Sequence, residues 1–180
     1  MHRYAPACLA LAMMACACSA PDPTPPGEPQ AAFEQFLDRY RKGPFIKTAT
    51  LENDTVARLT FYPSYEAYKG DNPDSQLSKT SYHLELGSEQ KAHSTLMRLP
   101  MALFRALPTL ERVQIGLASE DTRYAADVRR ADLEAFFDAD FSAIEGFDFT
   151  APWPAPIANR FDADGRAAYV DRFVSSVPGA

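Results

Sequence analysis

The stretch VQIGLASEDTRYAADV, residues 113 to 128, decides the fold class because it predicts a β-hairpin. Apolar and polar residues alternate on both sides of the polar segment SEDT, which is typical of two half-buried strands joined by a turn. The residues expected on the buried face are Val113, Ile115, Leu117, Tyr124, Ala126 and Val128. A sheet with one apolar face has to be covered by another layer of structure.

Earlier segments predict further strands. TVARLTFY, residues 55 to 62, alternates cleanly, and it follows the less regular GPFIKTATLE, residues 43 to 52, across a turn at Asn53 and Asp54. SYHLELG, residues 81 to 87, also alternates and predicts a strand with Tyr82, Leu84 and Leu86 on one face, after a long surface loop with one helical turn at residues 63 to 80. Together these segments predict an α+β fold, an antiparallel sheet of about five strands with helices mainly on one face.

Two helices are predicted in the first two thirds of the chain from apolar residues at three- and four-residue spacing. The first lies between Pro29, which suits a first turn, and Gly43, which suits a stop. The second follows the N-cap candidate Ser88, and Pro100 within it predicts a kink or two short helices that meet near Leu99, with Pro108 closing the segment. The two apolar faces consist of Phe33, Phe36, Leu37 and Tyr40, and of Ala92, Leu96, Leu99 and Leu103.

The last third predicts two more helices around an extended segment. Asp132 is a suitable cap for a short helix, and Asp162 or Asp164 for an amphipathic one. Their apolar residues are Leu133, Phe136 and Phe137, and Tyr169, Val170, Phe173, Val174 and Val177. Between them, residues 141 to 161 combine three prolines with Phe141, Phe147, Phe149, Trp153 and Phe161. We expect this segment to lie extended over the core, because large apolar groups seldom stay exposed at such density.

The N-terminus predicts a targeting segment. MHRYAPA carries Arg3 and no acid, and an apolar run too short to span a bilayer follows, ending in LALAMMACACSA, residues 9 to 20. This run resembles the signal of bacterial lipoproteins, whose lipobox ends in the cysteine that is acylated and becomes the first residue. The lipobox has an aliphatic residue at minus three followed by two small residues. Met13-Met14-Ala15-Cys16 has a bulky residue at minus three but another at minus two, whereas Ala15-Cys16-Ala17-Cys18 has small residues throughout and a weak minus three. The resemblance implies lipidation at Cys18, with Cys16 as the alternative.

On this interpretation residues 1–17 are a lipoprotein signal peptide, residues 18–29 a proline-rich tether and residues 30–180 a single α+β domain. The resemblance implies attachment to the membrane through N-terminal acyl chains, and Ser19 after the cysteine implies the periplasmic face of the outer membrane by the usual sorting pattern. A formal net charge of −6 argues against nucleic acid as a partner and against membrane binding through a basic patch. A C-x-C pair could instead bind a soft metal or form a disulfide, but no cysteine follows Cys18 to complete such a site.

Tyr62, Tyr65 and Tyr68, three residues apart in FYPSYEAYKGDN, are the candidate binding residues. On one helical turn they would share a face, and tyrosine is enriched at recognition surfaces because it combines a large rigid ring with a polar tip. The alternative is that this face packs on the sheet. A contact surface would take an envelope protein or a glycan as its partner.

Catalytic residues, metal ligands and cofactors are not expected. His83 and His93 do not converge with a serine in a nucleophile-elbow motif, and we expect both on the surface. DADG, residues 162 to 165, matches only part of a calcium loop, and helix capping explains its acids more simply. Other acids gather at Asp138, Asp140, Glu145 and Asp148.

These observations lead to the hypothesis of a lipid-anchored envelope protein that acts as a non-catalytic binding or assembly module. One alternative is an inhibitor or immunity protein for a cationic envelope hydrolase, since an acidic surface speeds capture of a basic partner. Another is a hydrolase that uses the carboxylates of residues 138–148 or 162–164.

Overall fold

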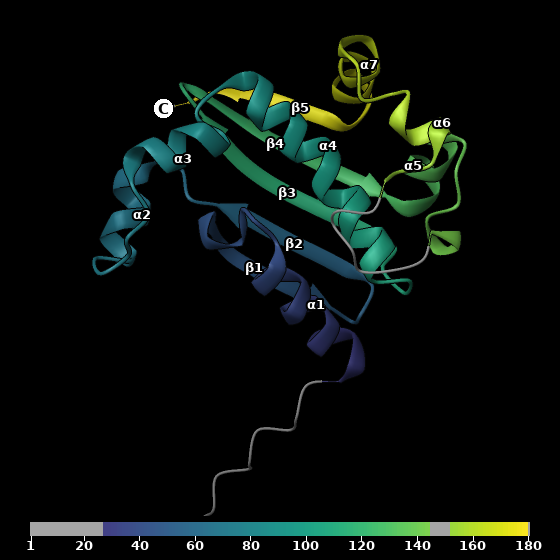
Figure 1. Cartoon of the computed structure of the whole chain (residues 1–180), viewed down its shortest axis with the longest axis horizontal. Coiled ribbons are helices and arrows are strands. Elements are labelled where there is room, and N and C mark those ends of the chain that lie inside the picture. The colour runs from purple at the N-terminus through teal and green to yellow at the C-terminus, as the bar shows by residue number, and fades with distance from the viewer. Residues whose placement is uncertain (1–26, 145–151, 180) are drawn as a thin grey trace, which may run out of the picture.

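The computed structural model describes residues 27–144 and 152–179, in which a five-stranded sheet carries helices on one face (Figure 1). This architecture confirms the predicted α+β class. In their order across the sheet, the strands are β1 (Ile46–Glu52), β2 (Val56–Phe61), β3 (Arg112–Ser119), β4 (Thr122–Arg129) and β5 (Val174–Pro178). The helices are α1 (Glu28–Arg39), α2 (Tyr65–Asp71), α3 (Lys79–Leu86), α4 (Glu89–Ala106), α5 (Arg130–Phe137), α6 (Ala155–Ala158) and α7 (Ala163–Phe173), with short 3₁₀ turns η1 (Gly43–Phe45) and η2 (Phe141–Ala143).

Both predicted hairpins are present. β1 and β2 pair antiparallel around Asn53 and Asp54, whose φ angles of 49° and 60° make the tight turn. β3 and β4 pair antiparallel with Ile115 opposite Ala126. The sheet is not antiparallel throughout, however, because β2 and β3 run parallel. A parallel pair needs a long crossover connection, and the segment that contains α2, α3 and α4 supplies it.

One face of the sheet is buried and the other is open. Alternate residues of β2, β3 and β4 are buried, as their sequence pattern predicts, and the residues between them are exposed or half-buried. Figure 1 shows α1 and α4 in front of the sheet and α7 above β5, with α2 and α3 at one end and α5 and α6 at the other. α4 is the central helix, since it packs on β3 and contacts both α1 and α7.

The strand predicted over residues 81 to 87 is wrong, because this segment is part of helix α3. Ser78 caps the helix by accepting a hydrogen bond from the Ser81 amide at 3.1 Å. Tyr82 and Leu86, four residues apart, are both buried, whereas Leu84 is 64% exposed. Three alternating residues satisfy the strand period, but the outer two also satisfy the helix period.

The fifth strand lies where the last helix was expected to continue. Asp162 caps α7 by accepting a hydrogen bond from the Gly165 amide at 2.7 Å, which confirms one of the two predicted caps. The helix ends at Phe173, and Val174 and Val177 belong to β5, which pairs antiparallel with β4. Asp132 does not cap α5 but lies in its first turn.

Pro100 neither divides nor ends its helix, since α4 is continuous from Glu89 to Ala106. A proline has no amide hydrogen to donate to the carbonyl four residues earlier, here that of Leu96. The hydroxyl of Tyr169, a fully buried residue of α7, donates a hydrogen bond of 2.8 Å to this carbonyl. A side chain from another helix therefore satisfies the acceptor that the proline leaves open.

The segment predicted to lie extended over the core is interrupted by two short helical turns, η2 and α6. Phe141 and Ile157 are fully buried in it, and Trp153 packs edge-on against Phe141 with ring centroids 6.2 Å apart. Phe147 and Phe149 lie outside the described residues, as do the acids Glu145 and Asp148.

Candidate functional site

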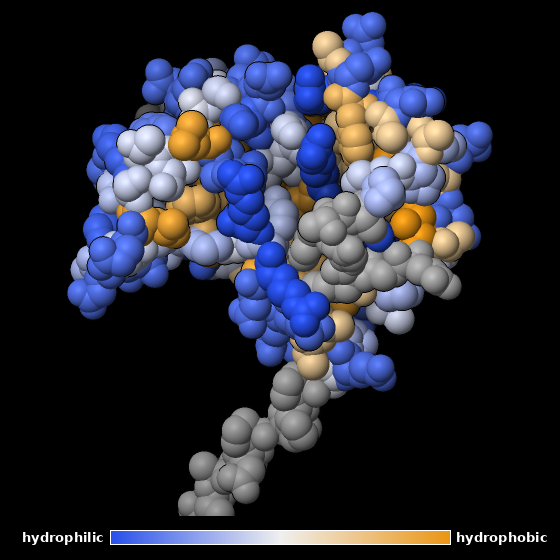
Figure 2. All heavy atoms as spheres, viewed as in Figure 1, coloured by the Kyte–Doolittle hydropathy of each residue, from blue (hydrophilic) through white to orange (hydrophobic). Residues whose placement is uncertain are grey.

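A groove with a volume of about 430 Å³ lies between the end of α1 and one face of α4, on the helical side of the sheet. Its walls combine aromatic rings with an unusual number of basic side chains, and Figure 2 shows strongly hydrophilic residues gathered over this part of the surface. We call it the basic groove. Its cationic residues are Arg39, Arg41, Lys42, Lys91, Arg98 and Arg105. Glu85 is the single carboxylate among the described residues that line it.

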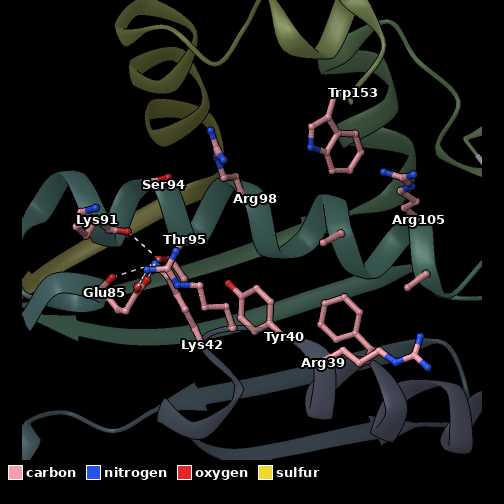
Figure 3. Close-up of a pocket in the computed structure, with 14 residues that line it drawn as sticks. Arg39, Tyr40, Lys42, Glu85, Lys91, Ser94, Thr95, Arg98, Arg105 and Trp153 are labelled. Atoms are coloured by element: carbon pink, nitrogen blue, oxygen red, sulfur yellow. Dashed lines mark hydrogen bonds and ion pairs between the residues drawn. The ribbon is translucent and has the colours of Figure 1, made fainter. Parts of the chain in front are cut away.

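The turn after α1 positions one wall of the groove. The Tyr40 amide donates a hydrogen bond of 2.9 Å to the Phe36 carbonyl at the helix end, and the Gly43 amide donates one of 2.7 Å to the Tyr40 carbonyl. A Cβ atom at position 43 would lie 2.3 Å from the Leu37 carbonyl oxygen, so only glycine allows this close return of the chain. The turn thus points Tyr40 and Lys42 toward α4 (Figure 3).

Lys42 joins three parts of the chain at one end of the groove. Its Nζ donates hydrogen bonds to the Glu85 carbonyl at 2.9 Å and to the Thr95 hydroxyl at 2.6 Å, and it lies 3.7 Å from the Glu85 carboxylate (Figure 3). Arg41 also pairs with that carboxylate. Burial lowers the pKa of Lys42 to about 8, although the Glu85 carboxylate opposes the shift. These contacts hold the turn after α1 against α3 and α4.

Aromatic rings line the middle and the far end of the groove. Tyr40 stacks on Phe36 with ring centroids 5.6 Å apart, and desolvation, followed by the Glu85 carboxylate, raises the pKa of its hydroxyl. Trp153, the single tryptophan of the chain, lies at the far end with the Arg105 guanidinium 5.3 Å from its ring centroid (Figure 3). The groove therefore has a polar end at Lys42 and an aromatic end at Trp153.

Two of the basic residues have no carboxylate partner in the described part of the chain. Within residues 27–144 and 152–179, neither Lys91 nor Arg98 has an ion-pair partner. The Arg98 guanidinium instead lies over the Phe161 ring, 4.7 Å from its centroid. The side chains of Lys91 and Arg98 are both exposed to solvent. Among the described residues of the lining, six cationic groups against one carboxylate give a net charge of +5, although the whole chain carries −6.

This groove was not among the predicted sites, although the sequence of α4 carries a signal for it. Lys91, Arg98 and Arg105 are spaced seven residues apart, which places them on one face of a helix. They lie next to the apolar stripe that predicted the helix. The contributions of Lys42, Glu85 and Trp153 come from three other segments, and only the fold brings them together.

The three predicted binding tyrosines form an aromatic cluster at the base of α2. Tyr62 and Tyr68 are buried, Tyr65 is half-buried, and the rings of Tyr62 and Tyr68 meet edge-on at 5.3 Å. The Tyr65 hydroxyl donates to the Leu77 carbonyl at 3.2 Å. This burial is what the packing alternative expects, and a binding role for these tyrosines stays a prediction.

The remaining candidate residues do not converge on the basic groove. His83 is exposed on α3, and His93 lies on α4 against the Tyr124 ring, beside a smaller cavity of about 280 Å³. Asp138 ends α5 with a φ of 52°, and Asp140 caps η2 through the Ser142 amide at 2.8 Å. Cys16 and Cys18 lie outside the described residues.

The remaining observations concern relatives of this chain, metal binding and membrane contact. No protein-family model, curated protein or solved structure matches this chain. In the part of the chain that the structure describes, no group of three histidine, cysteine, aspartate or glutamate side chains is placed to hold a metal ion. None of the described helices combines the length and the hydropathy needed to cross a bilayer.

Proposed function

We propose that this chain is a lipid-anchored protein of the cell envelope whose folded domain is a non-catalytic binding module, with the basic groove as its binding site. The groove carries this proposal, because a hollow of about 430 Å³ with aromatic walls and a few polar groups has the size and lining of a ligand pocket. The lipoprotein-like signal that ends at Cys18 supports the anchored location.

The contacts inside the groove support binding rather than chemistry. The Thr95 hydroxyl accepts from Lys42 and donates to the Lys91 carbonyl at 2.7 Å, and Thr95 is only 2% exposed. Lys42 itself is held by Glu85 and Thr95. A nucleophile or a base has to reach its substrate, whereas these groups are engaged in joining α1, α3 and α4.

The anchor is tested by the intact mass of the membrane-extracted protein. We expect a mass equal to the chain from Cys18 plus acyl groups, and we expect Cys18→Ser to abolish it while Cys16→Ser leaves it unchanged. Acylation lost in Cys16→Ser alone would move the anchor to the alternative cysteine. A chain that keeps both cysteines without lipid would contradict the envelope location.

The binding site is tested by filling the groove. Ala102, half-buried on α4, lines it, and Ala102→Phe would occupy part of its volume. Ala125→Phe adds the same ring on the exposed face of β4 and is the matched control. We expect small molecules that raise the melting temperature of the wild type to lose their effect in Ala102→Phe and to keep it in Ala125→Phe. Effects that persist in Ala102→Phe would place binding elsewhere.

A further inference from the structure

The basic groove concentrates positive charge in an acidic chain. The described lining carries a net charge of +5 and the whole chain carries −6, so the rest of the chain carries −11. Like charges in a half-enclosed hollow repel one another more strongly than on an open surface, because less water screens them. Such a hollow is stabilised by any anion that enters it.

The basic residues of α4 set the size of that anion. Lys91 and Arg98 are two turns apart on one helix face, so their Cα atoms are separated by roughly 10 Å. Long side chains can bring their charged groups together on a ligand with two anionic centres. A carboxylate would offset one charge, whereas a phosphate group carries about −1.5 to −2 and offers three acceptor oxygens. Guanidinium groups also match phosphate oxygens in pairs.

We propose that the basic groove binds a ligand that carries a diphosphate group, held by Lys91 and Arg98, with an apolar or aromatic portion against Tyr40 and Trp153. This inference rests on the proposed function, because it gives the chemical class of ligand for the same groove. The half-buried rings of Tyr40 and Trp153 supply apolar contact area, and Arg105 over the Trp153 ring extends the positive charge to the far end of the groove.

Trp153 provides the measurement. It is the single tryptophan of the chain and lines the groove, so its fluorescence reports on the groove directly. We expect inorganic pyrophosphate to change the emission of the purified full chain in a saturable way, with weaker binding as sodium chloride is added. A diphosphate group can belong to a soluble aromatic ligand or to a lipid head group, and two probes distinguish these sources: ADP, and farnesyl diphosphate in phosphatidylcholine vesicles. Tighter binding of ADP than of farnesyl diphosphate indicates the soluble aromatic ligand, and the reverse order indicates the lipid head group.

A pair of double variants tests the assignment to residues. Lys91→Gln with Arg98→Gln removes two charges from the groove, and Arg123→Gln with Arg129→Gln removes two from the open face of β4. We expect the first to weaken pyrophosphate binding at least about tenfold and the second to change it less than about twofold. All four side chains are exposed, and thermal melting checks that both variants fold.

Three results would overturn the inference: no saturable change of Trp153 emission with pyrophosphate, binding that is insensitive to salt, or an equal loss in the two double variants. If Ala102→Phe abolishes the stabilisation by other small molecules while pyrophosphate leaves Trp153 unchanged, the groove binds a different class of ligand. In that case the diphosphate inference fails and the proposed binding function stands.

Discussion

At the scale of single residues, the hydrogen bond from Tyr169 to the Leu96 carbonyl explains how α4 accommodates Pro100 in a buried position. A buried carbonyl without a donor costs about 1–3 kcal/mol. We therefore predict that Tyr169→Phe lowers the free energy of unfolding by about that amount, measured by urea denaturation. Tyr124→Phe is the control, because Tyr124 is also buried and its hydroxyl has no hydrogen-bond partner among the described residues.

The Pro100→Ala background gives a second test of this hydrogen bond. Pro100→Ala restores an amide that can donate to Leu96, so the hydroxyl of Tyr169 becomes dispensable in that background. Tyr169→Phe should then cost much less than it does beside Pro100. Equal costs in the two backgrounds would mean that the tyrosine stabilises the protein through ring packing alone.

Lys42 gives the stability a dependence on pH. Burial lowers its pKa in the folded chain to about 8, from an ordinary value of 10.5. Between these pH values the unfolded state binds more protons, so stability rises with pH, and the cost of the buried charge is fully present below pH 8. Relative to Lys42→Met, the wild type should gain at most about 3 kcal/mol of unfolding free energy across this window. Urea unfolding at a series of pH values measures the gain.

Lys91→Met is the comparison for this prediction, because it removes an exposed lysine from the same groove. A difference between wild type and Lys42→Met that stays constant from pH 7 to 10.5 would contradict the lowering of the Lys42 pKa by burial.

At the scale of elements, local patterns predicted most of the fold, and they failed where two periods fitted the same residues. Val113 to Val128 and Thr55 to Tyr62 alternate over enough residues that only a strand fits. Tyr82 to Leu86 is too short to decide, and the Ser78 cap outside it selects the helix. The spacing of Val174 and Val177 predicts a helix, whereas pairing with β4, a partner about 50 residues earlier in the chain, makes this segment a strand.

The packing of α2 leads to a third prediction. Tyr68 is 3% exposed and meets Phe45 edge-on at 5.5 Å, whereas Tyr65 is only half-buried. Tyr68→Ala should cost about 3–5 kcal/mol, as for other large buried aromatic residues, and Tyr65→Ala clearly less. Chemical denaturation of the two variants makes the comparison.

Changing Tyr62, Tyr65 and Tyr68 together to serine separates packing from binding. We expect a large fall in the melting temperature. Loss of a partner with unchanged melting would instead support the predicted contact surface at these tyrosines.

At the scale of the whole molecule, the net charge of the chain gives no indication of the basic groove. The net charge of −6 argued for an acidic surface, yet the fold gathers six cationic side chains from α1, the turn after it and α4 around one hollow. The seven-residue spacing on α4 was readable in the sequence, but Lys42 and Trp153 are more than 100 residues apart and meet at this groove only through the tertiary fold. The predicted number of strands was right, although one assigned segment is a helix and β5 was not foreseen.

The separation of charge between the basic groove and the rest of the chain also makes the domain an electric dipole. A dipole near a charged surface experiences a torque that turns its opposite pole toward that surface. Beside an anionic membrane or polymer, the domain would spend more time with the basic groove turned toward that surface than free tumbling allows. Orientation, and with it the accessibility of the groove, would then vary with ionic strength.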